Sequence, residues 1–167
     1  MNRKGVTLIE LLVVIGIMSI LLGIASLSFN QWMQRRNVER DIKELYADLM
    51  FFRHQSVVNG VRHRLQLPAA NMIAFRRYSA EGDMAGTEVR RRTLSRNMSR
   101  SAWLNPSPTE IEFNSRGVMP DIAAKTLCIN SDSEPSVDAI YITSTKINIA
   151  KIRNHGGVCG RANIDFR

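Results

Sequence analysis

The hydrophobic and polar positions divide the chain into zones, and the first of these is almost entirely apolar. Residues 11–34 are 24 consecutive positions without a charge, and most of them are aliphatic or small. As a helix this stretch would rise about 36 Å, enough to cross a hydrocarbon core of about 30 Å. A secretory signal peptide has a shorter apolar region, about 7 to 15 residues, followed by a small-residue cleavage site. The pattern therefore predicts a membrane-spanning segment that the protein keeps.

Beyond this stretch the apolar residues follow a helical period. Their spacing is four, three, four and three residues, which places them on one face of a helix. We expect one helix from Val6 to about Asn59 that packs this stripe on a globular domain, with Gly60 as its stop. The stripe consists of Val38, Ile42, Leu45, Leu49 and Phe52.

The remainder of the chain has the pattern of short strands. Val61, His63, Leu65 and Leu67 alternate with polar residues, as expected for a half-buried strand. No helical pattern separates the strands, so the fold class is α+β, with one long helix packed on an antiparallel β-sheet domain. The expected strands lie near 61–67, 72–78, 88–94, 110–114, 125–130, 137–143 and 146–152.

A short basic leader precedes the apolar zone. Residues 1–5 contain Arg3 and Lys4 and end at Gly5, and the sequence continues as Val-Thr-Leu-Ile-Glu-Leu-Leu-Val-Val. This motif resembles the class III signal of type IV prepilins and type II secretion pseudopilins. The resemblance implies that a prepilin peptidase cuts after Gly5 and that the new amino terminus, Val6, is methylated. Most members of the family have Phe at this position.

The same resemblance implies the domain organisation and the location of the protein. Residues 1–5 would be a cleaved leader and 6–34 the hydrophobic transmembrane and assembly half of the helix. Residues 35–167 would form a periplasmic pilin-like domain, with an amphipathic helix over 35–59 and the β-sheet over 61–167. The subunit would sit in the inner membrane before assembly, and in a pilus or pseudopilus afterwards.

Glu10 is the one carboxylate inside the apolar zone. A charged side chain in a spanning helix costs about 2.5 to 3.5 kcal/mol on insertion scales. In a filament the terminal amine of a neighbouring Val6 could pair with Glu10 and offset this cost. The alternative is a carboxylate that reaches the membrane interface. We expect Glu10 to act in subunit assembly.

Two further stretches narrow the resemblance. They are Leu-Met-Phe-Phe-Arg-His-Gln-Ser-Val over residues 49–57 and Glu-Phe-Asn-Ser-Arg-Gly over residues 112–117. Both resemble the FimT/GspH group of minor pilins and pseudopilins, in which they form the end of the long helix and a glycine turn. The implied fold is the type IV pilin-like fold.

Cys128 and Cys159 are the only cysteines, and both lie in the part expected to be exported. We expect a disulfide between them, because exported proteins meet an oxidising compartment. In the chain-entropy model such a bond stabilises the fold by about 3 to 4 kcal/mol. Two free buried thiols are the alternative.

No catalytic, metal or cofactor site is expected. His54, His63 and His155 have no serine or cysteine in a nucleophile motif beside them. Two cysteines without a pair of histidines leave a zinc ion short of ligands. The acidic run over residues 130–138 lacks the glycine and spacing of an EF-hand, so we expect a solvated loop there.

The arginines are concentrated in the middle of the chain. Residues 60–100 hold nine arginines and three acids, a net charge of +6 out of +8 for the whole protein. A guanidinium group suits phosphate because its planar fork donates two hydrogen bonds. The favoured interpretation is a basic rim that meets acidic neighbours in a filament, and weak, non-specific DNA binding is the alternative. The candidates for DNA binding are Arg62, Arg64, Arg76, Arg77, Arg90, Arg91, Arg92, Arg96, Arg100 and, in the C-terminal tail, Arg161.

The function expected from these features is that of a minor pilin, a structural subunit that enters or primes a type IV pilus and is not an enzyme. Its expected partners are other pilins or pseudopilins, the prepilin peptidase and the inner membrane. A type II secretion pseudopilin is the alternative in the same class. A DNA-binding minor pilin for DNA uptake is the alternative from another class.

Overall fold

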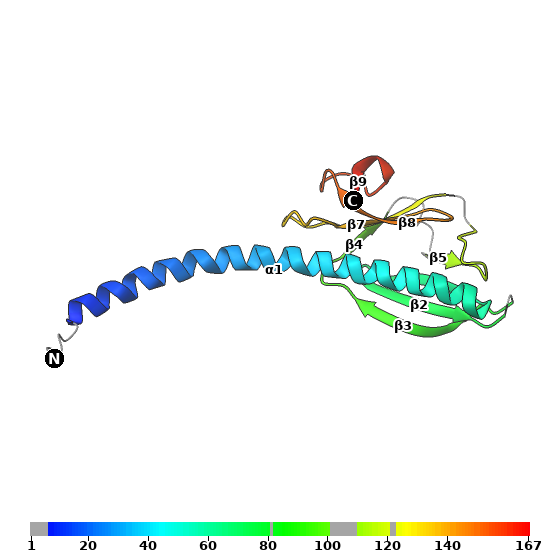
Figure 1. The fold of residues 1–167 in the computed structure, drawn as a ribbon, viewed down its shortest axis with the longest axis horizontal. Helices are drawn as coiled ribbons and strands as arrows, with labels where there is room; N and C mark the ends of the chain where they lie inside the picture. The colour runs from blue at the N-terminus through cyan, green and yellow to red at the C-terminus, as the bar shows by residue number, and fades with distance from the viewer. Residues whose placement is uncertain (1–6, 81, 101–109, 121–122) are drawn as a thin grey trace.

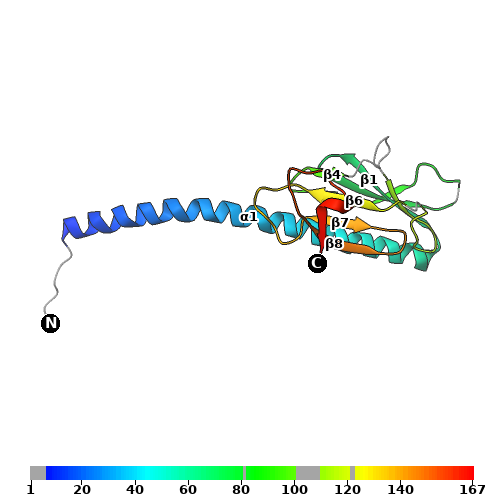
Figure 2. The same cartoon turned by 90° about the horizontal axis from the view of Figure 1, so that it is seen from above.

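The protein is one long helix with a β-domain, the head, around its C-terminal half (Figure 1). The computed structural model describes residues 7–80, 82–100, 110–120 and 123–167, apart from the side chains of residues 24–28, 100 and 110. Helix α1 covers Leu8–Asn59, which is 52 residues. Its N-terminal half projects from the head in both views (Figures 1 and 2). The expected fold, a long helix packed on antiparallel strands, is confirmed.

Both ends of α1 follow from local chemistry. Thr7 is the N-cap, and its hydroxyl accepts a hydrogen bond from the backbone N–H of Glu10 at 3.3 Å. Gly60 has φ 63°, the left-handed conformation that ends many helices. The helix ends where the sequence predicted, and its described start is two residues later than predicted because Thr7 caps it.

The predicted apolar stripe forms the centre of the core. Val38, Ile42, Leu45 and Leu49 are fully buried, and Phe52 is nearly so. Burying side chains of this size stabilises the fold by about 1.5 to 3 kcal/mol each. Leu65 of the first sheet and Ile140 of the second lie in the same apolar cluster, so α1 and both sheets share one core.

The strands form two antiparallel sheets where the sequence suggested one. Leu65 in β1 pairs with Phe75 in β2 on one side and with Ile111 in β5 on the other. Because β5 occupies the second edge of β1, the later strands form a separate sheet, which lies on a different side of α1 (Figure 1).

The first sheet has the order β3-β2-β1-β5, built from β1 (Arg62–Ala69), β2 (Met72–Tyr78), β3 (Thr87–Thr93) and β5 (Glu110–Phe113). The second has the order β4-β6-β7-β8-β9, built from β4 (Met98–Arg100), β6 (Lys125–Ile129), β7 (Ala139–Ile142), β8 (Ile147–Ile152) and β9 (Ile164–Phe166). A single turn of 3-10 helix, η2 (Arg161–Asn163), precedes β9.

The C-terminal tail is joined covalently to the second sheet. Cys128 in β6 and Cys159, just before η2, form a disulfide with Cα atoms 6.0 Å apart. Both cysteines are buried beside Ile152 and Ile164. The bond fixes the segment that leads into β9, the last strand of the sheet.

Candidate functional site: the exposed helix and the arginine cluster

The N-terminal half of α1 exposes aliphatic side chains from Leu8 to Leu22. The large hydrophobic residues from Leu8 to Leu22 are between 46% and 83% exposed. The head begins to bury this helix only near Val38. An apolar surface of this extent marks an interaction site, because monomeric soluble proteins rarely expose one.

Across the described part of the chain, no helix combines the length and the apolar character needed to cross a membrane, so the spanning segment expected over residues 11–34 is not found.

The expected processing site, Gly5 and Val6, lies outside the described residues. Glu10 is exposed and stands in the first turn of α1. The partial positive charge at a helix N-terminus favours an acid in this turn. The carboxylate of Glu10 therefore stabilises the start of its own helix. Its role in subunit assembly stays a prediction.

The arginines of β3 alternate between two environments. Arg90 and Arg92 point toward α1, where both form ion pairs with Asp48, and Arg92 also pairs with Glu44. The Nε atom of Arg92 lies 2.9 Å from a carboxylate oxygen of Asp48. Arg91 instead forms a bidentate pair with Glu88, with distances of 2.8 and 2.7 Å. All three guanidinium groups therefore already bind carboxylates of the same chain.

The arginines of β1 and β2 also make contacts within the head. Arg64 pairs with Glu112 and stacks its guanidinium group 4.7 Å from the centre of the Tyr78 ring. Arg62 lies 3.6 Å from Glu112. Arg76 donates to the backbone oxygen of Gly86 at 3.3 Å. These side chains lie along the first sheet rather than extending freely into solvent.

The remaining arginine candidates lie apart from this group. Arg96 donates to Gln34 at 2.7 Å, near the place where α1 leaves the head. Arg161 lies over the Phe166 ring at 4.4 Å, in the second sheet. Arg77 is exposed on β2. The side chain of Arg100 lies outside the described part of the structure, and DNA binding by any of these residues stays a prediction.

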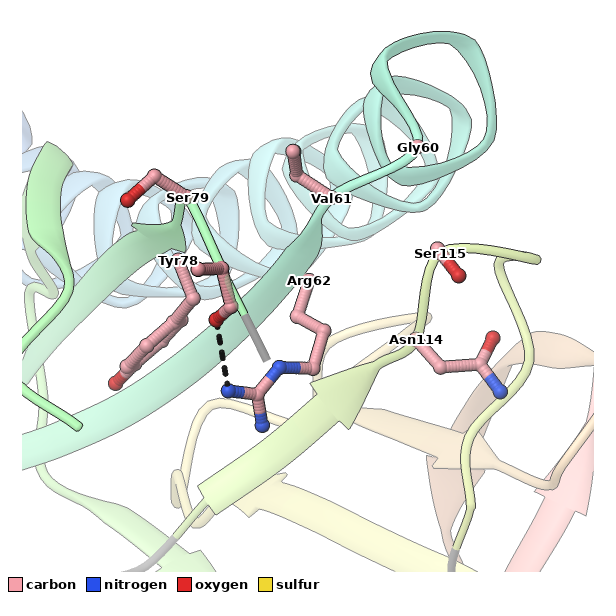
Figure 3. Close-up of a pocket in the computed structure, with 8 residues that line it drawn as sticks. Gly60, Val61, Arg62, Tyr78, Ser79, Asn114 and Ser115 are labelled. Carbon is pink, nitrogen blue, oxygen red and sulfur yellow. Dashed lines mark hydrogen bonds between the residues drawn. The ribbon is translucent and has the colours of Figure 1, made fainter. Parts of the chain in front are cut away.

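A pocket of about 200 Å³ lies at the end of α1 that is farther from the N-terminus (Figure 3). Gly60, Arg62, Tyr78 and Asn114 are among the residues that line it. Arg62 runs along its wall and donates to the backbone oxygen of Ala80 at 3.3 Å. This contact and the contact with Glu112 account for the partial burial of the arginine.

Sequence reasoning missed a row of buried carboxylates on α1. Asp41 accepts hydrogen bonds from the N–H and the hydroxyl of Ser95 at 2.7 and 2.6 Å. Glu39 accepts hydrogen bonds from the N–H and the hydroxyl of Ser136, both at 2.8 Å. Burial acts to raise the pKa of Glu39, but the bonds from Ser136 and nearby cations outweigh it, so its pKa is lowered. These acids tie α1 to loops of both sheets.

Asp138 departs from the solvated loop expected over residues 130–138, in which Asp132 and Glu134 are exposed as expected. Its side chain is completely buried, and it accepts a hydrogen bond from the N–H of Ile152 at 2.5 Å. The Nε2 atom of His155 lies 3.5 Å away. Burial raises the pKa of Asp138 above its usual range. The carboxylate holds the end of β8 beside the disulfide-bonded tail.

The two stretches that suggested the FimT/GspH group meet in space. Arg53 on α1 donates to the backbone oxygen of Gly117 at 2.8 Å. Gly117 has φ 69°, and a Cβ atom there would lie 2.7 Å from a methyl group of Val57. The turn can therefore approach the helix this closely only with glycine at its end.

Comparison with known proteins gives two matches. Residues 1–26 match the family described as the prokaryotic N-terminal methylation motif. The fold is similar to that of the type IV minor pilin FimU of Pseudomonas aeruginosa, with a TM-score of 0.53 and 14% identity. That similarity covers 78% of this chain and 97% of FimU. No curated protein sequence matches significantly.

Proposed function

We propose that the protein is a minor pilin of a type IV pilus, because its fold is similar to that of a type IV minor pilin and its first 26 residues match the N-terminal methylation motif. It serves as a structural subunit that enters the filament or primes its assembly. The observation that carries the proposal is the exposed aliphatic surface of the N-terminal half of α1, which is expected to be buried against another apolar surface. The N-terminal halves of neighbouring subunits supply that cover in a filament.

The processing steps follow from the same proposal. A prepilin peptidase removes residues 1–5 and methylates Val6, and the subunit waits in the inner membrane with its head in the periplasm. Glu10 then pairs with the terminal amine of a neighbouring subunit. Intact-mass measurement of the protein from assembled filaments tests the first step, and a chain that retains Met1 to Gly5 contradicts it.

The test of assembly uses Glu10. Glu10→Gln removes the charge and keeps the shape, so the variant should reach the membrane fraction at the normal level but be depleted from sheared filaments. Asp132→Asn is the control, because it removes one exposed carboxylate from the head. Normal recovery of Glu10→Gln from filaments contradicts the proposed pairing.

The proposal favours a structural subunit over a DNA-binding one. Arg64, Arg90, Arg91 and Arg92 already bind carboxylates of the same chain, and phosphate would have to compete with these partners. A type II secretion pseudopilin remains the alternative within the same class. Deleting the gene and measuring pilus assembly, protein secretion and DNA uptake in parallel separates the three functions.

A further inference from the structure

Aromatic and basic side chains follow one another where α1 leaves the head. We call Phe29, Trp32, Arg36, Arg40 and Lys43 the neck stripe. Phe29 and Trp32 are 55% and 50% exposed, and their ring centres lie 5.9 Å apart. Trp32, Arg36, Arg40 and Lys43 line one surface hollow, as expected from a spacing of four, four and three residues.

The acids of the same helical segment are less exposed than its bases, although Glu39 and Glu44 also line the hollow. Glu39 is buried against Ser136, and Asp41 is buried against Ser95. Glu44, at the far end of the hollow, forms an ion pair with Arg92 of β3. The segment has similar numbers of acids and bases in the sequence, but its most exposed charged side chains are the basic ones.

The aromatic and basic parts of the stripe are in contact. The guanidinium group of Arg36 lies 5.4 Å from the centre of the Trp32 ring. Along α1 the order is aliphatic, then aromatic, then basic. This order matches the depth profile of a bilayer surface, in which tryptophan lies at the headgroup level and cationic side chains lie just outside it.

We propose that the neck stripe binds the headgroups of anionic phospholipids and so holds the head against the membrane before assembly. The inference rests on the proposed function, which places the subunit at a membrane. Trp32 lies among the headgroups, and Arg36 and Arg40 bind lipid phosphates. An acidic surface on another subunit would use the basic residues but would not account for the exposed aromatic pair before them.

Native mass spectrometry of the full-length protein in mild detergent tests the proposal. Mixed micelles containing phosphatidylglycerol or phosphatidylcholine are the probes, and the number of lipids retained by the protein is counted. The protein should retain more phosphatidylglycerol than phosphatidylcholine. The double variant Arg36→Gln and Arg40→Gln should lose this preference by about 5- to 30-fold, from roughly 1 kcal/mol per cation near an anionic surface.

The matched control changes two cations at the other end of the head. Arg116 and Lys146 are exposed there, and replacing both with Gln removes the same charge. This control should retain phosphatidylglycerol as the unchanged protein does. Equal retention of the two lipids, or equal losses in the two double variants, overturns the proposal.

The failure of the lipid proposal and the failure of the proposed function can be told apart. If the neck variant retains phosphatidylglycerol normally while Glu10→Gln is depleted from filaments, only the lipid proposal is wrong. If the unchanged protein is absent from filaments, the minor-pilin function fails, whatever the lipid retention shows.

Discussion

At the scale of single residues, Asp48 carries much of the contact between α1 and the first sheet. Its side chain is 5% exposed and binds both Arg90 and Arg92. Asp48→Asn removes the negative charge between two arginines and should lower the free energy of unfolding by about 2 to 3 kcal/mol, since breaking a partly buried pair leaves its partners uncompensated. Urea unfolding of the full-length protein in mild detergent measures the change.

Glu88→Gln is the control for Asp48→Asn. Glu88 also binds an arginine, Arg91, but on the exposed side of β3. Solvent and salt screen such a pair, so its loss should barely move the urea midpoint. Equal destabilisation by the two variants would contradict the assignment of Asp48 as the main electrostatic contact.

Gly117 gives the second prediction at this scale. Gly117→Ala places a methyl group on a left-handed residue and against Val57, and should destabilise the head by about 1 to 3 kcal/mol. Gly160→Ala is the control, because no atom lies within 4 Å of its added Cβ and its backbone is extended. Thermal unfolding should separate the two variants, and equal midpoints would contradict the proposed clash.

At the scale of elements, His63 links β1 to the end of α1. The hydroxyl of Ser56 lies 2.9 Å from the backbone oxygen of Phe52 and 2.9 Å from the Nδ1 atom of His63. The two buried side chains therefore form a hydrogen bond between α1 and β1. Burial, and then the positive charge of Arg77, lower the pKa of His63.

This lowered pKa predicts a pH dependence of stability. Because the unfolded chain binds the proton more readily, the contribution of His63 is present above about pH 6.5 and is lost as the pH falls toward its lowered pKa. His63→Gln should therefore show a smaller drop in the urea midpoint between pH 7.5 and pH 5 than the unchanged protein. His54→Gln, at an exposed position, should leave the drop unchanged.

The sequence predicts the long elements well and the short ones poorly. The stripe from Val38 to Phe52 repeats at the helical period, and β1 alternates between half-buried and buried residues from Arg62 to Leu65, so both have a strong local signal. Strands β4 and β9 have three residues each, too few for a period to show. They form because β4 pairs with the edge of β6 and β9 pairs with the edge of β8. A local sequence pattern cannot predict this pairing, because the partner strands lie elsewhere in the chain.

The same limit explains what was missed at the candidate site. The charge surplus of residues 60–100 is visible in the sequence, but the acids that bind Arg90 and Arg92 come from α1, 42 to 48 residues away. The alternation of β3 predicts that Arg90 and Arg92 share a side, and they do. It cannot predict that Asp48 stands opposite them, because that depends on how the helix lies on the sheet.

At the scale of the whole molecule, the disulfide is the one covalent link between distant parts of the head. Cys128 and Cys159 are separated by 31 positions. Reduction should lower the free energy of unfolding by about 3 to 4 kcal/mol in the chain-entropy model. Urea unfolding with and without reductant measures the effect. The double variant Cys128→Ser and Cys159→Ser should be insensitive to reductant.

Thiol labelling of the denatured, non-reduced protein checks the starting state of that comparison. No cysteine should be labelled if the bond forms in the cell as it does in the structure. Labelling of both cysteines would contradict the disulfide prediction, because there would then be no disulfide for the reductant to break.

The course of α1 along the head has a mechanical consequence. In the proposed filament, tension would pull the subunit along α1, and side-chain bonds join that helix to both sheets. Glu39, Asp41, Asp48 and Arg53 are spread over four turns of the helix, so the load is shared among them as shear. Sliding the helix out would require these bonds to break together. The head therefore resists axial force far better than it would if α1 could peel away one turn at a time.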